Sequence, residues 1–221
     1  MSGSHGLLVE AFDRHQTGRF DEAERLYRRI LVGDPAQNEA LHRQGLLAAQ
    51  LGRLEEADRL LGHTLSLDPT TSEAAVNHAK ILRALRRPED AARRFRLALT
   101  SSPALLAALE GLGHAEREAG NAEAAAGAYG RAARLGTGAA VLHQWGIALD
   151  GLGRPAAAAE ALRRAARLDP TVPSVAVRLA SILERMGCAG EAAGWYRHAL
   201  VLQPGRSEVR EALVRATESR R

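Results

Sequence analysis

The stretch Leu142–Pro170, LHQWGIALDGLGRPAAAAEALRRAARLDP, decides the fold because it contains two short amphipathic segments joined by a turn. Small or apolar residues recur at helical spacing in both segments, first as Leu142, Gly146 and Leu149 and then as Ala158, Leu162 and Ala165. Gly151 and Gly153 predict the end of the first helix. Pro155 predicts the start of the second, where the missing N–H of proline removes no hydrogen bond. The stretch is therefore predicted to be a helical hairpin.

This hairpin repeats along the chain. Pro35, Pro69 and Pro103 are 34 residues apart, as are Pro170 and Pro204, and Thr137 occupies the corresponding place in a unit one residue shorter. A small residue recurs in the first helix of each unit: Ala11, Gly45, Ala79, Gly113, Gly146 and Ala180. An alanine recurs in the second helix: Ala23, Ala57, Ala91, Ala125, Ala158 and Ala192. Four residues further on stands a large apolar residue: Tyr27, Leu61, Phe95, Tyr129, Leu162 and Tyr196. Self-similarity at this period is typical of a stacked repeat array.

With these three columns, the sequence resembles the tetratricopeptide repeat family over nearly its whole length. The resemblance implies an all-α fold, a right-handed superhelical solenoid of six helix-turn-helix units, followed by a C-terminal capping helix. We expect one domain over residues 1–221, with repeats at about 4–37, 38–71, 72–105, 106–138, 139–172 and 173–206 and the cap at 207–219. Ser207 is a suitable N-cap for this last helix, and its apolar residues fall on one face.

Composition is consistent with an elongated helical protein. Aromatic residues make up 4% of the chain, so the predicted core is a thin seam of alanine and leucine. No apolar run reaches membrane-spanning length, and the N-terminus has no basic segment before its short apolar run, which together predict a cytoplasmic protein. The single cysteine, Cys188, excludes an internal disulfide and is interpreted as an inert turn residue.

In the resembled family the first helices form the concave wall of a groove. Carried over to this sequence, the family's groove positions predict a partner-binding surface made of His42, Arg43, Leu46, Gln50, Asn77, Lys80, Arg83, His114, Arg117, His143, Gln144, Ile147 and Arg178. The net charge of +4 could suggest nucleic acid. The full set of groove positions on the first helices, however, holds six basic residues, the five above and Arg185, and six acidic ones, Glu39, Glu73, Glu110, Glu118, Asp150 and Glu184, whereas phosphate binding needs a continuous basic track. We therefore expect a protein or peptide segment as the partner and no nucleic acid.

Two sub-patterns of the family are not matched. The positions of the carboxylate clamp of co-chaperones do not carry the required residues, and only Asn77 fits the asparagine ladder of O-GlcNAc transferases. Residues 15–31, HQTGRFDEAERLYRRIL, resemble the opening repeat of bacterial O-GlcNAc-transferase-like or SPINDLY-type proteins. This likeness covers one repeat.

No catalytic constellation is visible in the sequence. Residues 151–156 match the dinucleotide-binding glycine pattern, but they follow a predicted helix rather than a strand, and turn chemistry explains the glycines. Neither a cofactor nor a metal ion is expected, since the histidines and the one cysteine lack ligand spacing. Three hypotheses remain: a non-catalytic scaffold that binds an extended partner segment in its concave groove, the substrate-recruiting region of a larger bacterial glycosyltransferase or other transferase, and an assembly scaffold that self-associates through Leu8 and Phe12.

Overall fold

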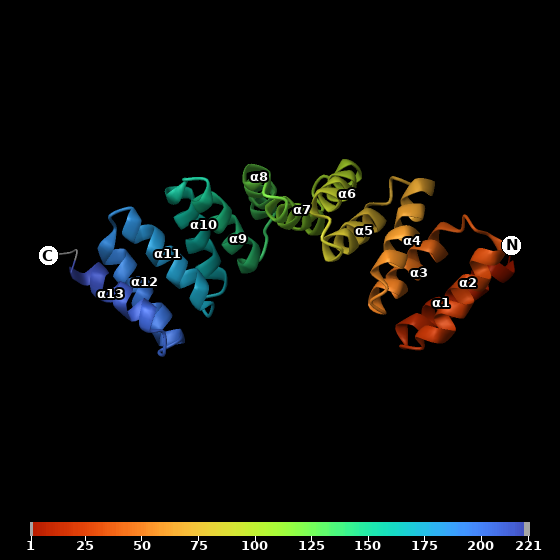
Figure 1. Cartoon of the computed structure of the whole chain (residues 1–221), viewed down its shortest axis with the longest axis horizontal. Helices are drawn as coiled ribbons and strands as arrows, with labels where there is room; N and C mark the ends of the chain where they lie inside the picture. Colours follow the sequence, from red (N-terminus) through yellow and green to blue (C-terminus); the bar gives the residue numbers. More distant parts are fainter. Residues whose placement is uncertain (1, 219–221) are drawn as a thin grey trace. The chain divides into compact units, whose positions relative to one another are not determined.

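A computed structural model describes residues 2–218, and its side chains are described from residue 5 onward. This part of the chain contains helices and no strand. The helices, coloured along the chain in Figure 1, are α1 (Ser2–Gln16), α2 (Phe20–Gly33), α3 (Asn38–Gln50), α4 (Leu54–Leu67), α5 (Ser72–Ala84), α6 (Pro88–Ser101), α7 (Leu106–Glu118), α8 (Ala122–Arg134), α9 (Ala139–Gly151), α10 (Pro155–Leu168), α11 (Pro173–Arg185), α12 (Ala189–Leu202) and α13 (Ser207–Glu218). The predicted all-α fold is confirmed.

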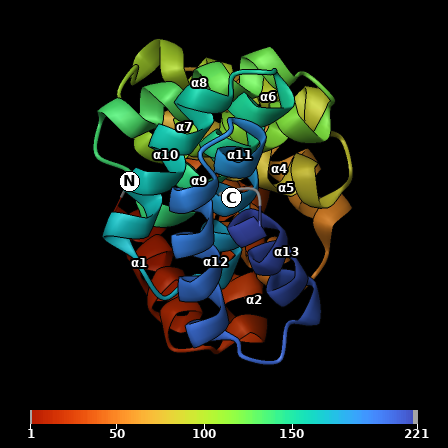
Figure 2. The same cartoon turned by 90° about the vertical axis from the view of Figure 1, so that its left-hand side faces the viewer.

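The chain divides into two compact units, Met1–Ala115 and Glu116–Arg221, with the boundary inside α7. In the first unit the pairs α1/α2, α3/α4 and α5/α6 are hairpins, and each packs against the next. In the second unit α9/α10 and α11/α12 are hairpins, and α13 packs on α12 (Figure 2). A single domain over residues 1–221 stays a prediction.

The small residues of the first helices let the two helices of a hairpin approach closely. A Cβ atom added to Gly45 would lie 2.9 Å from Cγ of Leu61, and one added to Gly146 would lie 2.7 Å from Cγ of Leu162. The alanines of the second helices and the large residues four positions later are buried in every repeat. Because these columns form the core, the register predicted from the sequence matches the packing.

The turn within each hairpin uses one backbone geometry. The turn residue has a positive φ angle, which glycine adopts without strain, at Gly18, Gly52, Gly120, Gly153 and Gly187. The next residue then donates its N–H to a carbonyl five residues back, as from Arg53 to Ala48 at 2.9 Å. Arg86 takes the same position with φ 59°, so the third turn keeps this geometry without a glycine.

The last helix has the character of a cap. It begins at Ser207, as predicted, and it buries Val209, Ala212 and Ala216 while Arg210 and Glu211 face solvent. The predicted last residue, 219, lies outside the described residues. A helix with one apolar and one polar face can end a stack of hairpins without leaving apolar surface open.

Candidate functional site

A hollow of about 280 Å³ lies over the first helices of the first unit. We call it the first-unit hollow. It is lined by two residues of α1, four of α3 and three of α5: His15, Gln16, Arg43, Leu46, Ala49, Gln50, Asn77, Lys80 and Ile81. Five of these were predicted as groove residues. The stacking of α1, α3 and α5 brings them to one surface, although they are about one repeat apart in sequence.

Hydrogen bonds between neighbouring repeats fix the polar side chains of this hollow. The His15 ring shares a hydrogen bond with Oε1 of Gln50 at 2.7 Å, and the Asn77 amide shares one with Nε2 of His42 at 3.2 Å. His42 itself is only 7% exposed and does not line the hollow. Burial lowers the pKa of His42, so the ring is neutral at pH 7 and can accept from the Asn77 amide. His42 therefore orients Asn77 from below the surface.

The cationic residues of the first-unit hollow differ in their surroundings. The Arg43 guanidinium lies 4.1 Å from the ring centre of Phe12 and also pairs with Glu39. Lys80 is exposed at the rim. Phe12 is 36% exposed and Leu8 is half-buried, packed against the core of the unit. Arg43 thus shields part of the aromatic surface that was predicted to support self-association.

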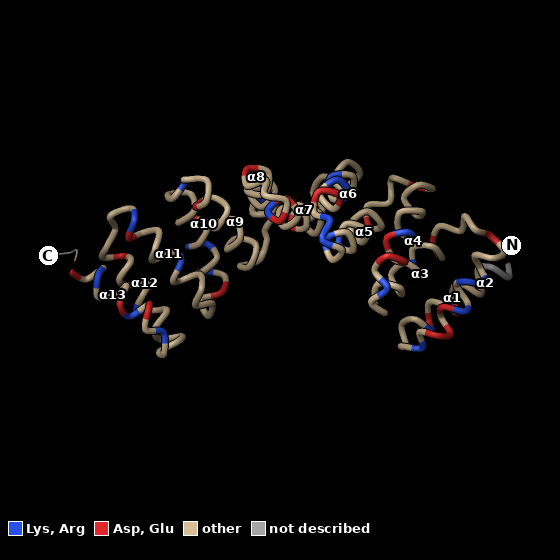
Figure 3. The backbone as a smooth tube through the Cα atoms, viewed as in Figure 1, with Lys and Arg blue, Asp and Glu red and all other residues tan. Residues whose placement is uncertain are grey.

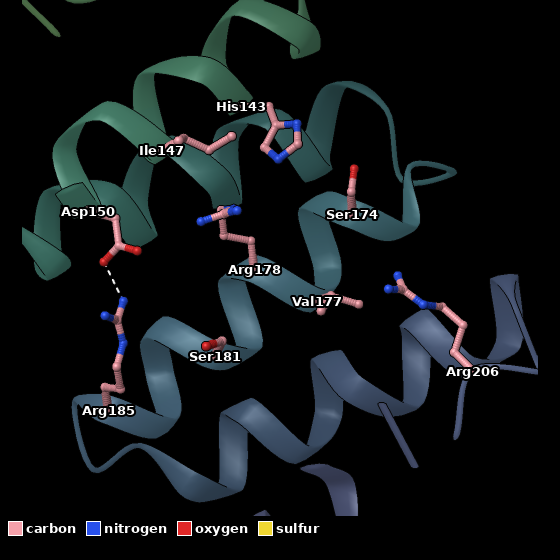
Figure 4. A pocket seen from close by; sticks show the side chains of 9 residues that line it. All are labelled: His143, Ile147, Asp150, Ser174, Val177, Arg178, Ser181, Arg185 and Arg206. Atoms are coloured by element: carbon pink, nitrogen blue, oxygen red, sulfur yellow. Dashed lines mark hydrogen bonds and ion pairs between the residues drawn. The ribbon is translucent and has the colours of Figure 1, made fainter. Parts of the chain in front are cut away.

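A second hollow, of about 510 Å³, lies in the second unit and is shown in Figure 4. We call it the second-unit hollow. It is lined by three residues of α9, five of α11 and one from the turn before α13: His143, Ile147, Asp150, Ser174, Val177, Arg178, Ser181, Arg185 and Arg206. His143, Ile147 and Arg178 were predicted groove residues. Ile147 and Val177 give the surface an apolar part between the charged groups.

Only some of the charges in the second-unit hollow are compensated. Arg185 forms an ion pair with Asp150, which is drawn as a dashed line in Figure 4. Within residues 5–218, neither the Arg178 nor the Arg206 guanidinium makes a hydrogen bond or ion pair. Nε2 of His143 is buried and has no hydrogen-bond partner there either. Burial, together with the charge of Arg178, lowers the pKa of His143, so this ring is neutral at pH 7 and the hollow carries excess positive charge.

The remaining predicted residues lie on first helices of the hairpins but line neither hollow. Arg83 follows Lys80 by three residues on α5, Gln144 is half-buried on α9, and His114 and Arg117 belong to α7. His114 falls in the first unit and Arg117 in the second. Whether these residues contact a partner stays a prediction.

Sequence reasoning missed Arg206, because that residue lies in a turn and not on a first helix. Its position in the repeat is nevertheless regular, since it precedes α13 as Thr71 precedes α5 and Val172 precedes α11. In Figure 4 its side chain reaches from that turn toward Val177. Among these equivalent residues Arg206 lines a hollow, whereas Thr71 and Val172 do not line the hollows described here.

Charges of both signs alternate along the helices of the first unit, as the blue and red segments of Figure 3 show. Many pair locally, for example Arg28 with Glu24 and Arg19 with Glu22. Among residues 5–218 no three His, Cys, Asp or Glu side chains come together as metal ligands would. No helix in the described part of the chain is both long enough and apolar enough to cross a membrane.

A family model described as tetratricopeptide repeat matches residues 13–58, 76–140 and 143–207. The chain belongs to the tetratricopeptide repeat (TPR) family. TPR proteins are generally protein-interaction scaffolds, and the TPR fold is typically non-catalytic. No curated protein matches the sequence significantly.

Solved structures share the fold at low sequence identity. The crystal structure of MamA is 22% identical with a TM-score of 0.71, and the alignment covers 77% of this chain and 94% of MamA. YrrB, described as a TPR protein with an unusual peptide-binding site, is 16% identical with a TM-score of 0.75, at coverages of 87% and 97%. Pseudomonas aeruginosa pilF is 23% identical with a TM-score of 0.63, at coverages of 85% and 86%. At these identities the likeness establishes the TPR fold alone.

Proposed function

We propose that the protein is a non-catalytic scaffold that binds an extended segment of a partner protein along the first helices of its hairpins. The observation that carries the proposal is the pair of hollows. Each lies within one unit, each is lined by first helices of consecutive repeats, and together they contain eight of the thirteen residues predicted as groove residues.

The chemistry of the first-unit hollow suits a peptide backbone. Gln50 and Asn77 provide amide groups, which both donate and accept hydrogen bonds, and each is held in place by a histidine. Leu46 and Ile81 provide apolar contacts beside them. An extended segment presents unpaired N–H and C=O groups, so prealigned amides can bind it without first being ordered.

A photo-crosslinking experiment tests the proposal. The photoreactive residue p-benzoylphenylalanine replaces Gln50, which is exposed in the hollow, and in a second variant it replaces Arg59, which is exposed on α4 outside the hollow. The variants are irradiated in lysate of the native host. We expect a discrete protein adduct from position 50 and none from position 59. Equal labelling from both positions, or no adduct from position 50, would contradict the proposal.

A charge substitution provides an independent check. Lys80→Glu places a negative charge at the rim of the hollow, and Arg59→Glu makes the same change of net charge on α4. Both residues are exposed, so neither substitution should alter the melting temperature. The Lys80 variant should lose the crosslinked partner, while the Arg59 variant should keep it.

Self-association through α1 is a second candidate, supported by the exposure of Val9 (57%) and Phe12 (36%) on that helix. If it occurs, the molar mass from light scattering will rise with protein concentration, and Val9→Ser with Phe12→Ser will hold the protein as a monomer. A constant monomer mass up to millimolar concentration would contradict it.

A further inference from the structure

We infer that the second-unit hollow binds acidic side chains of the partner segment, with Arg178 and Arg206 each pairing with a carboxylate. This inference deepens the proposed function and rests on it. The ligand chemistry it assigns is glutamate or aspartate in an extended segment. One of the two arginines, Arg206, lies outside the groove positions carried over from the family.

The charges that line the second-unit hollow are not balanced. The hollow is lined by three arginines and one aspartate, and that aspartate, Asp150, already pairs with Arg185. Some arginines of the second unit pair with carboxylates, such as Arg154 with Glu123 and Arg163 with Glu191. Arg178 and Arg206 have no such partner among the described residues and lie together in a concave site, where their fields add and attract negative charge.

The two unpaired guanidinium groups approach the hollow from different elements. Figure 4 shows the Arg178 side chain extending toward α9 and the Arg206 side chain approaching Val177 from the other side. In this view Val177 lies between the two guanidinium groups, and Ile147 lies on α9 beside Arg178. An acidic side chain is complementary to this surface, since its methylene groups can contact the apolar side chains while its carboxylate reaches a guanidinium.

The second-unit hollow also contains polar groups that a bound peptide would satisfy. Nε2 of His143 is buried without a partner among the described residues, and the hydroxyl group of Ser174 lies at the same surface. Both can hydrogen-bond to the backbone of a segment whose side chains pair with the arginines. A nucleic acid fits less well, because a phosphate backbone requires a continuous basic track and this site has two separated cations.

Synthetic peptides test the inference. Four nine-residue peptides of glycine and serine carry two glutamines, one glutamate with one glutamine, two glutamates, or two phosphoserines at the same two positions. Binding to the full chain is followed by NMR through the Nε–Hε signals of the arginine side chains, at about 20 mM salt so that screening is weak. We expect saturable shifts of the Arg178 and Arg206 signals, with affinity rising about threefold to tenfold for each glutamate.

Matched variants locate the effect. Arg178→Gln and Arg206→Gln should each remove the gain from one glutamate, and the double variant should bind the glutamate and glutamine peptides equally. The control is Arg134→Gln with Arg197→Gln, which removes the same charge from exposed positions on α8 and α12 outside the hollow and should keep the preference for glutamate.

Several results would overturn the inference. These are equal binding of glutamate and glutamine peptides by the unmodified protein, equal loss in the control variant, tighter binding of the phosphoserine peptide, or tighter binding of a nine-residue single-stranded oligonucleotide. The proposed function is judged separately by the adduct from position 50 in the first unit. If a partner is captured at position 50 but the protein binds the glutamate and glutamine peptides equally, only the ligand chemistry assigned to the second-unit hollow is rejected.

Discussion

The hairpins of both units are packed through the same columns of small residues. The junction between two repeats, however, holds a polar pair of side chains in the first unit and an apolar pair in the second. At the α4/α5 junction of the first unit, the residue after the buried alanine is Asp58 and the residue before the next small residue is His78. At the α10/α11 junction of the second unit, the corresponding residues are Ala159 and Leu179, both fully buried. A hydrogen-bonded polar pair and an apolar pair thus occupy equivalent places.

The polar junction is extended by a turn residue. His78, which is 3% exposed, shares a hydrogen bond with Oδ1 of Asp58 at 2.6 Å, and Arg87 donates to Oδ2 of the same carboxylate at 2.8 Å. Arg87 also pairs with Asp90. In the neighbouring α2/α3 junction Arg53 joins Glu24 and Glu56 in the same way. The repeat therefore specifies the shape of this junction strictly and its chemistry loosely, since a polar pair and an apolar pair fit the same place.

The largest effect is expected from placing a polar residue in the apolar junction. Leu179→His should destabilise the protein by about 2–4 kcal/mol, since it buries an imidazole where α10 offers Ala159 and no acceptor. Urea unfolding measures the change. Adding Ala159→Asp supplies the missing acceptor and should restore part of the loss. If the two substitutions simply add as losses, the junctions are not equivalent.

A somewhat smaller effect is expected from breaking the polar junction. Asp58→Ala leaves the ring of His78 buried without its hydrogen-bond partner and should cost about 2 kcal/mol in the free energy of unfolding. The double variant Asp58→Ala with His78→Leu copies the apolar junction and should be closer in stability to the unmodified protein than the single variant is. A double-mutant cycle by urea unfolding measures this coupling, and zero coupling would contradict the comparison.

The hairpin turns of the two units also differ, and exchanging their turn residues should change the free energy of unfolding by about 1 kcal/mol. Arg86 holds the positive φ angle that Gly153 holds in the second unit, and a side chain in that conformation is strained. Arg86→Gly should therefore raise the free energy of unfolding by about 1 kcal/mol, and Gly153→Arg should lower it by a similar amount. Unchanged urea midpoints for both variants would show that the turns tolerate either residue.

The smallest effect is expected from pH. Burial outweighs the attraction of Asp58 and lowers the pKa of His78, to which the nearby charges of Arg94 and Arg87 also contribute. The unfolded chain binds a proton near the ordinary pKa of 6.5, whereas the folded chain binds it only at lower pH, so stability falls as pH drops below about 6.5.

Gln44 occupies the place of His78 in the preceding junction, so His78→Gln is a conservative substitution that does not titrate. This variant should lose less stability between pH 7 and pH 5 than the unmodified protein. The dependence should shrink without vanishing, because burial also lowers the pKa values of His42 and His143. An identical pH dependence in the two proteins would show that His78 does not contribute to the loss of stability at low pH.

Much of the fold could be predicted from the sequence, because residues of the same size recur at the same packing positions in each repeat. The alanine and glycine columns identified the hairpins and their register, and Ser207 marked the start of the last helix. Contacts between repeats were not predictable in the same way. The burial of His42 beneath Asn77 and the pairing of Arg185 with Asp150 depend on how one hairpin is rotated against the next. Arg206 was missed since turns carry no helical period.

The contacts within the hairpins and between adjacent repeats are local in sequence. The most widely separated side-chain hydrogen bonds described above, His15 to Gln50, Asn77 to His42 and Arg185 to Asp150, each span 35 residues. Chains with short contact separations fold quickly, because little loop entropy is lost before a contact forms. During synthesis, each hairpin that leaves the ribosome can dock at once on the hairpin made before it. The polar junctions of the first unit would then form before the apolar junction of the second unit, which is still being translated at that time.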